Sequence, residues 1–109
     1  MGKFIIAKSK NGKFQFNLKA GNGLIILTSD GFSTKNACMN GIESVRRSSM
    51  DESKFEKQTS PTGQFYFNLR ATDGQVVGSS LMYESEHSVK NGIISVEMNA
   101  PDADVEDLD

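Results

Sequence analysis

Few residues of this chain are of the types that carry out chemistry, and their spacing assembles no catalytic group. Cys38 is the only thiol and His87 the only imidazole. A nucleophilic cysteine needs a base beside it, and a zinc site needs several clustered ligands. The adjacent carboxylates of Asp51 and Glu52 lie in no apolar segment that would raise a carboxyl pKa. The sequence therefore predicts no catalytic residues, no metal site, no cofactor and no enzymatic activity.

The glycine-rich turns and the acidic end of the chain also lack ligand-binding patterns. Gly21 and Gly23 precede an apolar β-type run rather than a helix, so they do not form a dinucleotide- or phosphate-binding loop. Residues 101–109 hold five of the fourteen acidic residues but lack the spacing of a calcium-binding EF-hand loop. We interpret this acidic tail as a solubilising, disordered end.

The composition indicates a small cytoplasmic protein without a membrane partner. The chain has 109 residues, of which 37% are hydrophobic, and this suits one domain spanning residues 1–109. No apolar run approaches the length of a membrane span, and the N-terminus lacks the patterns of a signal peptide or a myristoylation site. A single cysteine fits a reducing compartment. The formal charge is −2, although the first 100 residues carry twelve bases and nine acids.

The chain is a tandem repeat. When residues 3–49 are placed over residues 54–100, 16 of the 47 positions are identical without any gap. Chance would give about three. A repeat of this length buries too little surface to fold securely by itself, so the two copies are expected to share one core around a pseudo-twofold axis. The same offset carried further would make the tail the start of a third, truncated copy.

Each repeat reads as three strands followed by a helix. In repeat 1 the strands are KFIIAK, the alternating KFQFNLKA and LIILTS, separated by turns that end in glycine. A three-residue hairpin loop with a glycine bulge pairs Lys8 with Phe14 and Phe4 with Leu18, which places the aromatic side chains on one face. A two-residue turn would put Phe4 on the wrong face. We therefore predict an α+β fold with a single antiparallel sheet and two helices packed on one face.

The helices are expected to begin near Thr34 and Ser85, whose hydroxyl groups suit N-caps. Apolar residues then recur at helical spacing, with Cys38 on the inward face. Because a glycine stands in the middle of each helix at a cost of about 1 kcal/mol, we expect a close approach of another element there. The two glycines are Gly41 and Gly92.

The motifs FxFNLKAxNG and NGIxSV, present in both copies with small changes, resemble the YegP-type family of uncharacterised bacterial proteins. The resemblance covers nearly the whole chain. It implies a sheet built from two three-strand-plus-helix repeats, with a C-terminal strand exchanged between the halves. It implies no activity.

The predicted register also defines an outer sheet face, on which Asn is repeated but its neighbours differ. The row Ile5–Asn17–Leu27 of repeat 1 is apolar, whereas its counterpart Glu56–Asn68–Gly78 is not. A one-residue slip before Leu24 is an alternative that would replace Ile25 and Leu27 by Ile26 on this face. The candidate interaction residues are Ile5, Ala7, Gln15, Asn17, Lys19, Ile25, Leu27, Tyr66, Asn68 and Arg70.

Two functions follow from this face. An exposed apolar patch favours a non-enzymatic interaction module that binds a protein or associates weakly with itself. The alternative is single-stranded nucleic-acid binding through the Asn, Lys, Arg and Tyr side chains, although Tyr66 is the only aromatic residue available for stacking.

Overall fold

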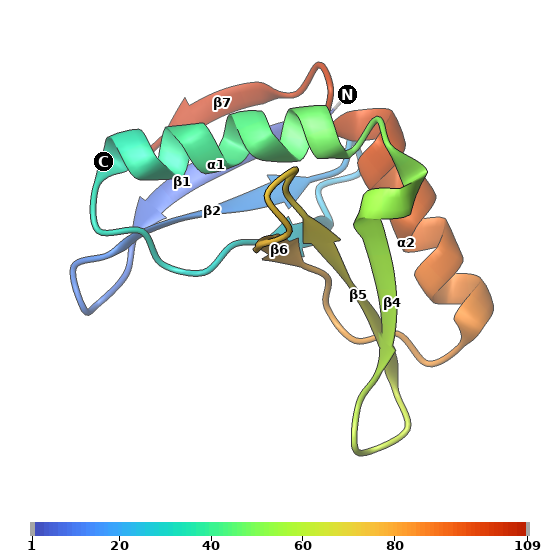
Figure 1. The fold of residues 1–109 in the computed structure, drawn as a ribbon. Coiled ribbons are helices and arrows are strands. Elements are labelled where there is room, and N and C mark those ends of the chain that lie inside the picture. The colour runs from blue at the N-terminus through green and yellow to red at the C-terminus, as the bar shows by residue number, and fades with distance from the viewer. Residues whose placement is uncertain (1, 109) are drawn as a thin grey trace.

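A computed structural model describes residues 2–108 as one sheet of seven strands with two helices (Figure 1). Met1 and Asp109, the ends of the predicted domain and tail, lie outside the described residues. The strand order is β4-β5-β6-β3-β2-β1-β7. Repeat 1 supplies β1 (Lys3–Lys8), β2 (Phe14–Lys19), β3 (Ile25–Thr28) and α1 (Lys35–Ser48). The 3-10 turn η1 (Glu52–Lys54) leads into repeat 2, whose elements are β4 (Phe55–Thr59), β5 (Phe65–Arg70), β6 (Val76–Ser79) and α2 (Glu86–Asn99), followed by β7 (Asp104–Asp107).

The two repeats are related by a pseudo-twofold axis at the centre of the sheet. β3 and β6 pair antiparallel through Thr28 and Ser79, which are equivalent positions of the two copies. Equivalent residues face each other across a twofold axis, so this pair marks its place. The isolated bridges Phe14–Phe32 and Phe65–Tyr83 are related in the same way.

Both hairpins have the predicted register. Phe4 pairs with Leu18 in repeat 1, and Phe55 pairs with Leu69 in repeat 2. Gly12 and Gly63 adopt φ values of 81° and 85°, the left-handed conformation that the bulged three-residue loop requires. The alternating apolar residues of β1 and β2 therefore all point to the core, as expected.

The helices also begin where the sequence predicted. The Thr34 hydroxyl accepts a hydrogen bond from the Ala37 amide at 3.1 Å, and the Ser85 hydroxyl accepts one from the Ser88 amide at 3.0 Å. Both helices pack on one face of the sheet, and each contacts strands of the other repeat. The buried apolar side chains of the two helices are those of Cys38, Ile42, Val45, Val89, Ile93 and Val96.

The close approach expected at the helix glycines is present in both copies. A Cβ atom at Gly41 would lie 2.7 Å from the Phe32 ring, and one at Gly92 would lie 2.5 Å from the Tyr83 hydroxyl. Real Cβ atoms do not come this close to other side chains. The helix glycines thus let the aromatic residue that follows the third strand pack under the helix.

The tail differs from its predicted disorder. Residues 104–107 form β7, which pairs with β1 in the parallel direction, so that Lys3 lies opposite Asp104 and Phe4 opposite Val105. Six strands are antiparallel as predicted, and β7 is the exception. The disorder prediction is wrong because Ala103 and Val105 bury apolar surface against the core. β7 follows repeat 2 and completes the edge of repeat 1, which is the exchange that the family resemblance implied.

Candidate interaction surface

The residues whose side chains could take part in catalysis or bind a metal do not form a cluster in the structure. Cys38 is buried in the core, and burial raises the pKa of its thiol, with the nearby Asp107 carboxylate adding to the effect. His87 is exposed and contacts Asn91 at 3.3 Å. Over residues 2–108, no three His, Cys, Asp or Glu side chains gather as a metal site would require. Within the same range no helix has the length and apolar character to cross a membrane.

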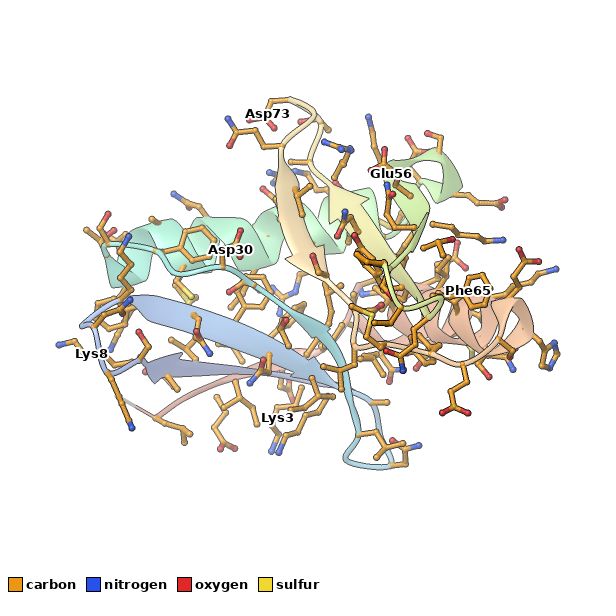
Figure 2. All side chains as sticks on the ribbon, turned by 90° about the horizontal axis from the view of Figure 1, so that it is seen from below. Lys3, Lys8, Asp30, Glu56, Phe65 and Asp73 are labelled. Atoms are coloured by element: carbon orange, nitrogen blue, oxygen red, sulfur yellow. The ribbon has the colours of Figure 1, made fainter. Side chains whose placement is uncertain are left out.

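The uncovered face of the sheet is the surface that the two repeats build differently. Figure 2 shows the molecule from below, where no helix lies over β1 and β2. We call Ile5, Ala7, Asn17, Lys19 and Ile25 the repeat 1 face. Their equivalents Glu56, Gln58, Asn68, Arg70 and Val76 form the repeat 2 face. Gln15 and Tyr66 continue the two faces, and all twelve of these side chains except Val76 are half-buried.

One predicted member of this surface is misplaced. Leu27 pairs with Leu18 rather than with Asn17, and its side chain is fully buried in the core. The cause is a bulge at Ile26, which shifts β3 by one residue, so that Thr28 lies opposite Asn17. The predicted alternative, a slip before Leu24, does not occur. The shift arises within β3, so that Ile25 stays beside Lys19 and Ile26 is buried.

The same bulge recurs in repeat 2, where Ser79, not Gly78, lies opposite Asn68. A hydroxyl that the sequence reasoning missed lies directly after each bulged third strand and continues its contact with the second strand. The Ser29 side chain accepts a hydrogen bond from the Phe16 amide at 2.9 Å, and Ser80 does the same for Phe67 at 3.0 Å. The identity of these two serines between the copies was the available signal.

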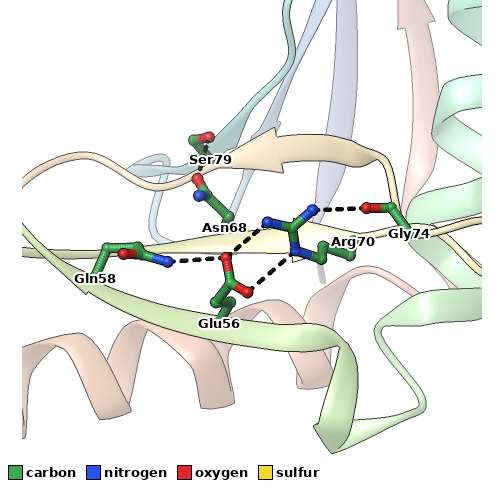
Figure 3. A network of polar contacts seen from close by, with 6 residues as sticks. All are labelled: Glu56, Gln58, Asn68, Arg70, Gly74 and Ser79. Carbon is green, nitrogen blue, oxygen red and sulfur yellow. Dashed lines mark hydrogen bonds and ion pairs between the residues drawn. The ribbon is translucent and has the colours of Figure 1, made fainter.

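The repeat 2 face is a closed polar network (Figure 3). Arg70 donates two hydrogen bonds to the Glu56 carboxylate, at 3.0 and 3.2 Å, and a third to the Gly74 carbonyl at 2.6 Å. Gln58 donates to Glu56 at 2.8 Å. These hydrogen bonds, chiefly those from Arg70, lower the pKa of Glu56. The guanidinium is thus already neutralised, which weakens it as a phosphate ligand.

Asn68 lies on the same face in a separate contact, in which its side-chain oxygen accepts a hydrogen bond from the Ser79 hydroxyl at 2.7 Å. The sequence placed Asn68 and Arg70 on one face but missed the ion pair between Glu56 and Arg70. The signal for it was the hairpin register, which puts Glu56 opposite Asn68 and one row away from Arg70.

The repeat 1 face lacks this network because Ile5 and Ala7 replace Glu56 and Gln58. Lys19 stands where Arg70 stands, without a carboxylate opposite it. A shallow hollow of about 370 Å³ lies here between β1, the turn after β2 and β7. Its lining includes Ile5, Lys19 and the ion pair between Lys3 and Glu106, whose atoms are 3.1 Å apart. The arrangement presents apolar and cationic groups together.

Other proteins are similar to this chain in sequence and contain the same repeat. A model of the family described as "Domain of unknown function (DUF1508)" matches the chain twice, over residues 9–56 and 61–107. The chain is 45% identical over 106 residues to the UPF0339 protein YegP of Escherichia coli strain K12, covering 97% of this chain and 96% of that protein. It is 47% identical to a UPF0339 protein encoded in the ptx operon 5' region of Stutzerimonas stutzeri, covering 95% and 94% respectively.

Two solution NMR structures have the same fold. The structure of Escherichia coli yegP, described as a protein of unknown function, matches with a TM-score of 0.94 at 45% identity, covering 98% of this chain and 92% of that one. A UPF0339 protein of Shewanella oneidensis matches with a TM-score of 0.93 at 43% identity, covering 98% and 91%.

Proposed function

The chain belongs to the DUF1508 family of proteins of unknown function, and we propose that it is a non-enzymatic protein-interaction module that binds through the repeat 1 face. The family confirms the resemblance carried by the repeated motifs. One observation supports the proposal. At equivalent positions, the repeat 2 face satisfies its polar groups internally, whereas the repeat 1 face leaves Ile5, Ala7 and Lys19 without such a network.

The chemistry of the repeat 1 face indicates the kind of partner. Half-buried Ile5 and Ala7 offer apolar contact area, and Lys19 lies on the neighbouring strand, one row from Ile5. A partner with an apolar side chain flanked by carboxylates would bury the first group and pair with the second. Such a partner could be another protein or, for weak self-association, a second copy of this chain.

Nucleic acid, the alternative partner, has less support. Arg70 is engaged with Glu56, and Tyr66 is the one aromatic residue of the two faces. Single-strand binders combine free cations with several stacking rings. A steep loss of single-stranded RNA binding with rising salt would count for nucleic acid and against the protein partner.

The absence of enzymatic activity and the cytoplasmic location are parts of this proposal. The support for the first is that the only thiol is buried, whereas the one histidine, His87, is exposed on the other helix. The support for the second is the use of one free cysteine and no disulfide, which suits a reducing compartment.

The test uses two lysine substitutions at equivalent positions. Ala7→Lys places a charge in the repeat 1 face, and Gln58→Lys places the same charge in the repeat 2 face. The immobilised proteins are compared by quantitative capture of partners from a cell lysate and by sedimentation of each variant. We expect Ala7→Lys to lose a partner, or self-association, that the wild type and Gln58→Lys retain. Equal loss in both variants, or loss only in Gln58→Lys, would refute a role of the repeat 1 face.

Thermal melting separates binding from folding in this comparison. Both positions are half-buried on an uncovered sheet face, so each lysine can reach solvent and should shift the melting temperature little. A large drop in stability for Ala7→Lys alone would mean that the position serves packing instead.

A further inference from the structure

The sheet has two edges, and the tail covers only one of them. β7 lies along β1, whereas β4 has no strand on its outer side among residues 2–108. Figure 1 shows β4 beside α2 in the way that β1 lies beside α1. Because the repeats are equivalent, the covered edge shows what kind of segment the open edge would accept. This edge is separate from the repeat 1 face.

β7 is held on β1 by backbone pairing and by one apolar side chain. It runs parallel to β1, and the Leu108 amide donates a hydrogen bond to the Ile6 carbonyl at 3.0 Å. Val105 lies opposite Phe4 and packs against the core, which leaves the Phe4 ring fully buried. The covered edge therefore contributes to the core.

Cations on α1 fix the two ends of β7. Arg46 donates a hydrogen bond to the Ala103 carbonyl at the start of the segment. Lys35 pairs with the Asp107 carboxylate at its end, at 2.8 Å. Along the chain, the inward positions of the bound segment are thus a small residue, Ala103, then a branched apolar residue, Val105, and then an acidic residue, Asp107.

The open edge has an equivalent groove, which we call the β4 groove. Its middle is lined by Phe55, Ile93 and Ile94, and its volume is about 300 Å³. Phe55 is the equivalent of Phe4 but is only half-buried, and Ile94 is 41% exposed. Uncovered apolar side chains beside an unpaired strand are the two features of a site that accepts an added strand.

The chain cannot fill the β4 groove with its own linker. The residues equivalent to 103–107 are 52–56, and these form η1 and the first part of β4 itself. The sheet therefore has two equivalent edges but only one tail strand among residues 2–108. The tail covers the β1 edge, and the β4 edge has no added strand.

The charges of the β4 groove differ from those around β7. Glu97 stands at the position of Arg46, and Glu52 joins it at the same end of the groove. At the other end Lys57 and Lys90 line the groove. The equivalent of Lys35 is Glu86, so these two lysines supply the cations there. The groove is acidic at its start, apolar in the middle and basic at its end.

We propose that the β4 groove binds an extended segment of another protein, which adds to the sheet as a strand parallel to β4. The segment carries Lys or Arg, then a branched apolar residue two positions later, then Asp or Glu two positions after that. The basic residue pairs with Glu97 and Glu52, and the apolar residue packs on Phe55. The Lys57 carbonyl, equivalent to that of Ile6, accepts a backbone hydrogen bond from the segment.

A second copy of the tail fits this groove less well. Its first inward residue is Ala103, whose carbonyl is held by Arg46 in its own groove. In the β4 groove Glu97 cannot donate to that carbonyl as Arg46 does, and the Ala103 side chain offers Glu97 and Glu52 no cation in compensation. The groove therefore selects by charge.

The test uses the tail sequence as a scaffold for peptide probes. The first probe is PDKDVEDL, which has Lys at the place of Ala103, and it is compared with PDEDVEDL and with the native PDADVEDL. Binding to the full chain is measured by fluorescence anisotropy of labelled peptides, and the site is located by backbone amide NMR. We expect the Lys probe to bind at least about fivefold more tightly than the Glu probe, which is the effect of one partly exposed ion pair.

Variants of the protein make the result specific to the groove. Glu97→Lys should reverse the preference, so that the Glu probe binds more tightly than the Lys probe. Ile94→Glu should abolish binding of the Lys probe, because it places a charge on the apolar floor. The matched control is Met98→Glu on the same helix, outside the groove and 75% exposed, which should bind normally.

Several results would overturn the proposal. One is the absence of binding of the Lys probe up to about 1 mM. Another is perturbation of β1 and β7 amides rather than those of β4, which would mean that the probe displaces the tail. Equal affinity for the Lys and Glu probes would show that the groove does not select its partner by charge. Tighter binding of the native tail sequence would identify a second copy of this chain as the occupant.

Discussion

The two repeats differ at their shared axis and again far from it, and the two differences have different causes. Leu27 and Gly78 are equivalent positions that meet near the axis, where a Cβ atom on Gly78 would lie 2.8 Å from the Leu27 side chain. A twofold axis brings equivalent positions together, so only one of them has room for a large residue. Packing alone therefore requires this asymmetry.

Away from the axis, packing imposes no such requirement. Most core residues of the two copies match, as Phe16 matches Phe67 and Val45 matches Val96, whereas the buried Ile6 corresponds to the exposed Lys57 on the open edge. Ile5 and Glu56, however, occupy equivalent positions on an uncovered face, and Phe4 and Phe55 lie on equivalent edges with different coverage. Differences that packing does not demand are where a duplicated fold can acquire a binding function.

The largest expected effect is on the reactivity of a thiol in each repeat. The wild type carries Cys38, and the double variant Cys38→Val with Val89→Cys moves the thiol to the equivalent position of repeat 2. Both positions are buried, so a disulfide reagent should label each at least about a thousandfold more slowly than in denaturant. We expect the repeat 2 thiol to be the faster one, because the β4 edge is open.

Stopped-flow labelling with and without denaturant measures both rates. Equal rates that track global unfolding would show that the repeats open together despite the open edge. Fast labelling of native Cys38 would contradict its burial in the core.

The asymmetry at the axis gives the largest effect on stability. Leu27→Ala removes a fully buried side chain and should reduce the free energy of unfolding by about 2–5 kcal/mol. Gly78→Leu alone should also destabilise, because two leucines would compete for one space. The double variant Leu27→Gly with Gly78→Leu should regain part of the loss. Urea denaturation measures all four proteins, and additive losses in the double variant would argue against shared space.

A smaller effect is expected at the helix glycines. Gly92→Ala should destabilise by about 1–2 kcal/mol, since the clash with Tyr83 outweighs the better helix propensity of alanine. Tyr83→Phe removes the atom closest to the new methyl group, so the same substitution should cost less in that background. Gly41→Ala, which faces Phe32, is the matched case without a hydroxyl. A cost that is unchanged by Tyr83→Phe would contradict the close approach.

The smallest effect concerns the ion pair of the repeat 2 face and depends on pH. The pKa of Glu56 is lowered in the folded protein by the hydrogen bonds from Arg70. A lowered pKa contributes stability above the unfolded pKa, near 4.3, and this stability is lost as pH falls through the folded pKa. Wild type should therefore melt slightly above Glu56→Gln near neutral pH, and the gap should close in acid. Ile5→Gln, at the equivalent position, should show no gap that depends on pH in this way.

Local chemistry explains why much of the fold could be predicted from the sequence. The bulged loops at Gly12 and Gly63 set both hairpin registers, because a left-handed glycine and alternating side chains leave one arrangement with all aromatic residues inside. The caps at Thr34 and Ser85 are likewise decided by neighbouring residues. These interactions span only a few positions, so their patterns are visible in a linear sequence.

The candidate surface was only partly predictable. Nine of its ten proposed residues lie on the uncovered face, but Leu27 lies in the core because a bulge at Ile26 shifts β3. The bulge is a property of the pairing between β2 and β3, which is set across the sheet. No propensity of Ile26 itself signals that extra residue.

The sequence by itself determined the repeat, the two hairpins, the helix starts and the close approach at Gly41 and Gly92, since each rests on local geometry or on identity between the copies. Only the tertiary structure decided that Leu27 packs against Gly78, that β7 runs parallel to β1 and that no strand of residues 2–108 covers the outer side of β4. These features depend on contacts between segments far apart in the chain. Local sequence preferences do not distinguish between the alternative arrangements of these segments. Burial of apolar surface and steric exclusion at the long-range contacts select one of them.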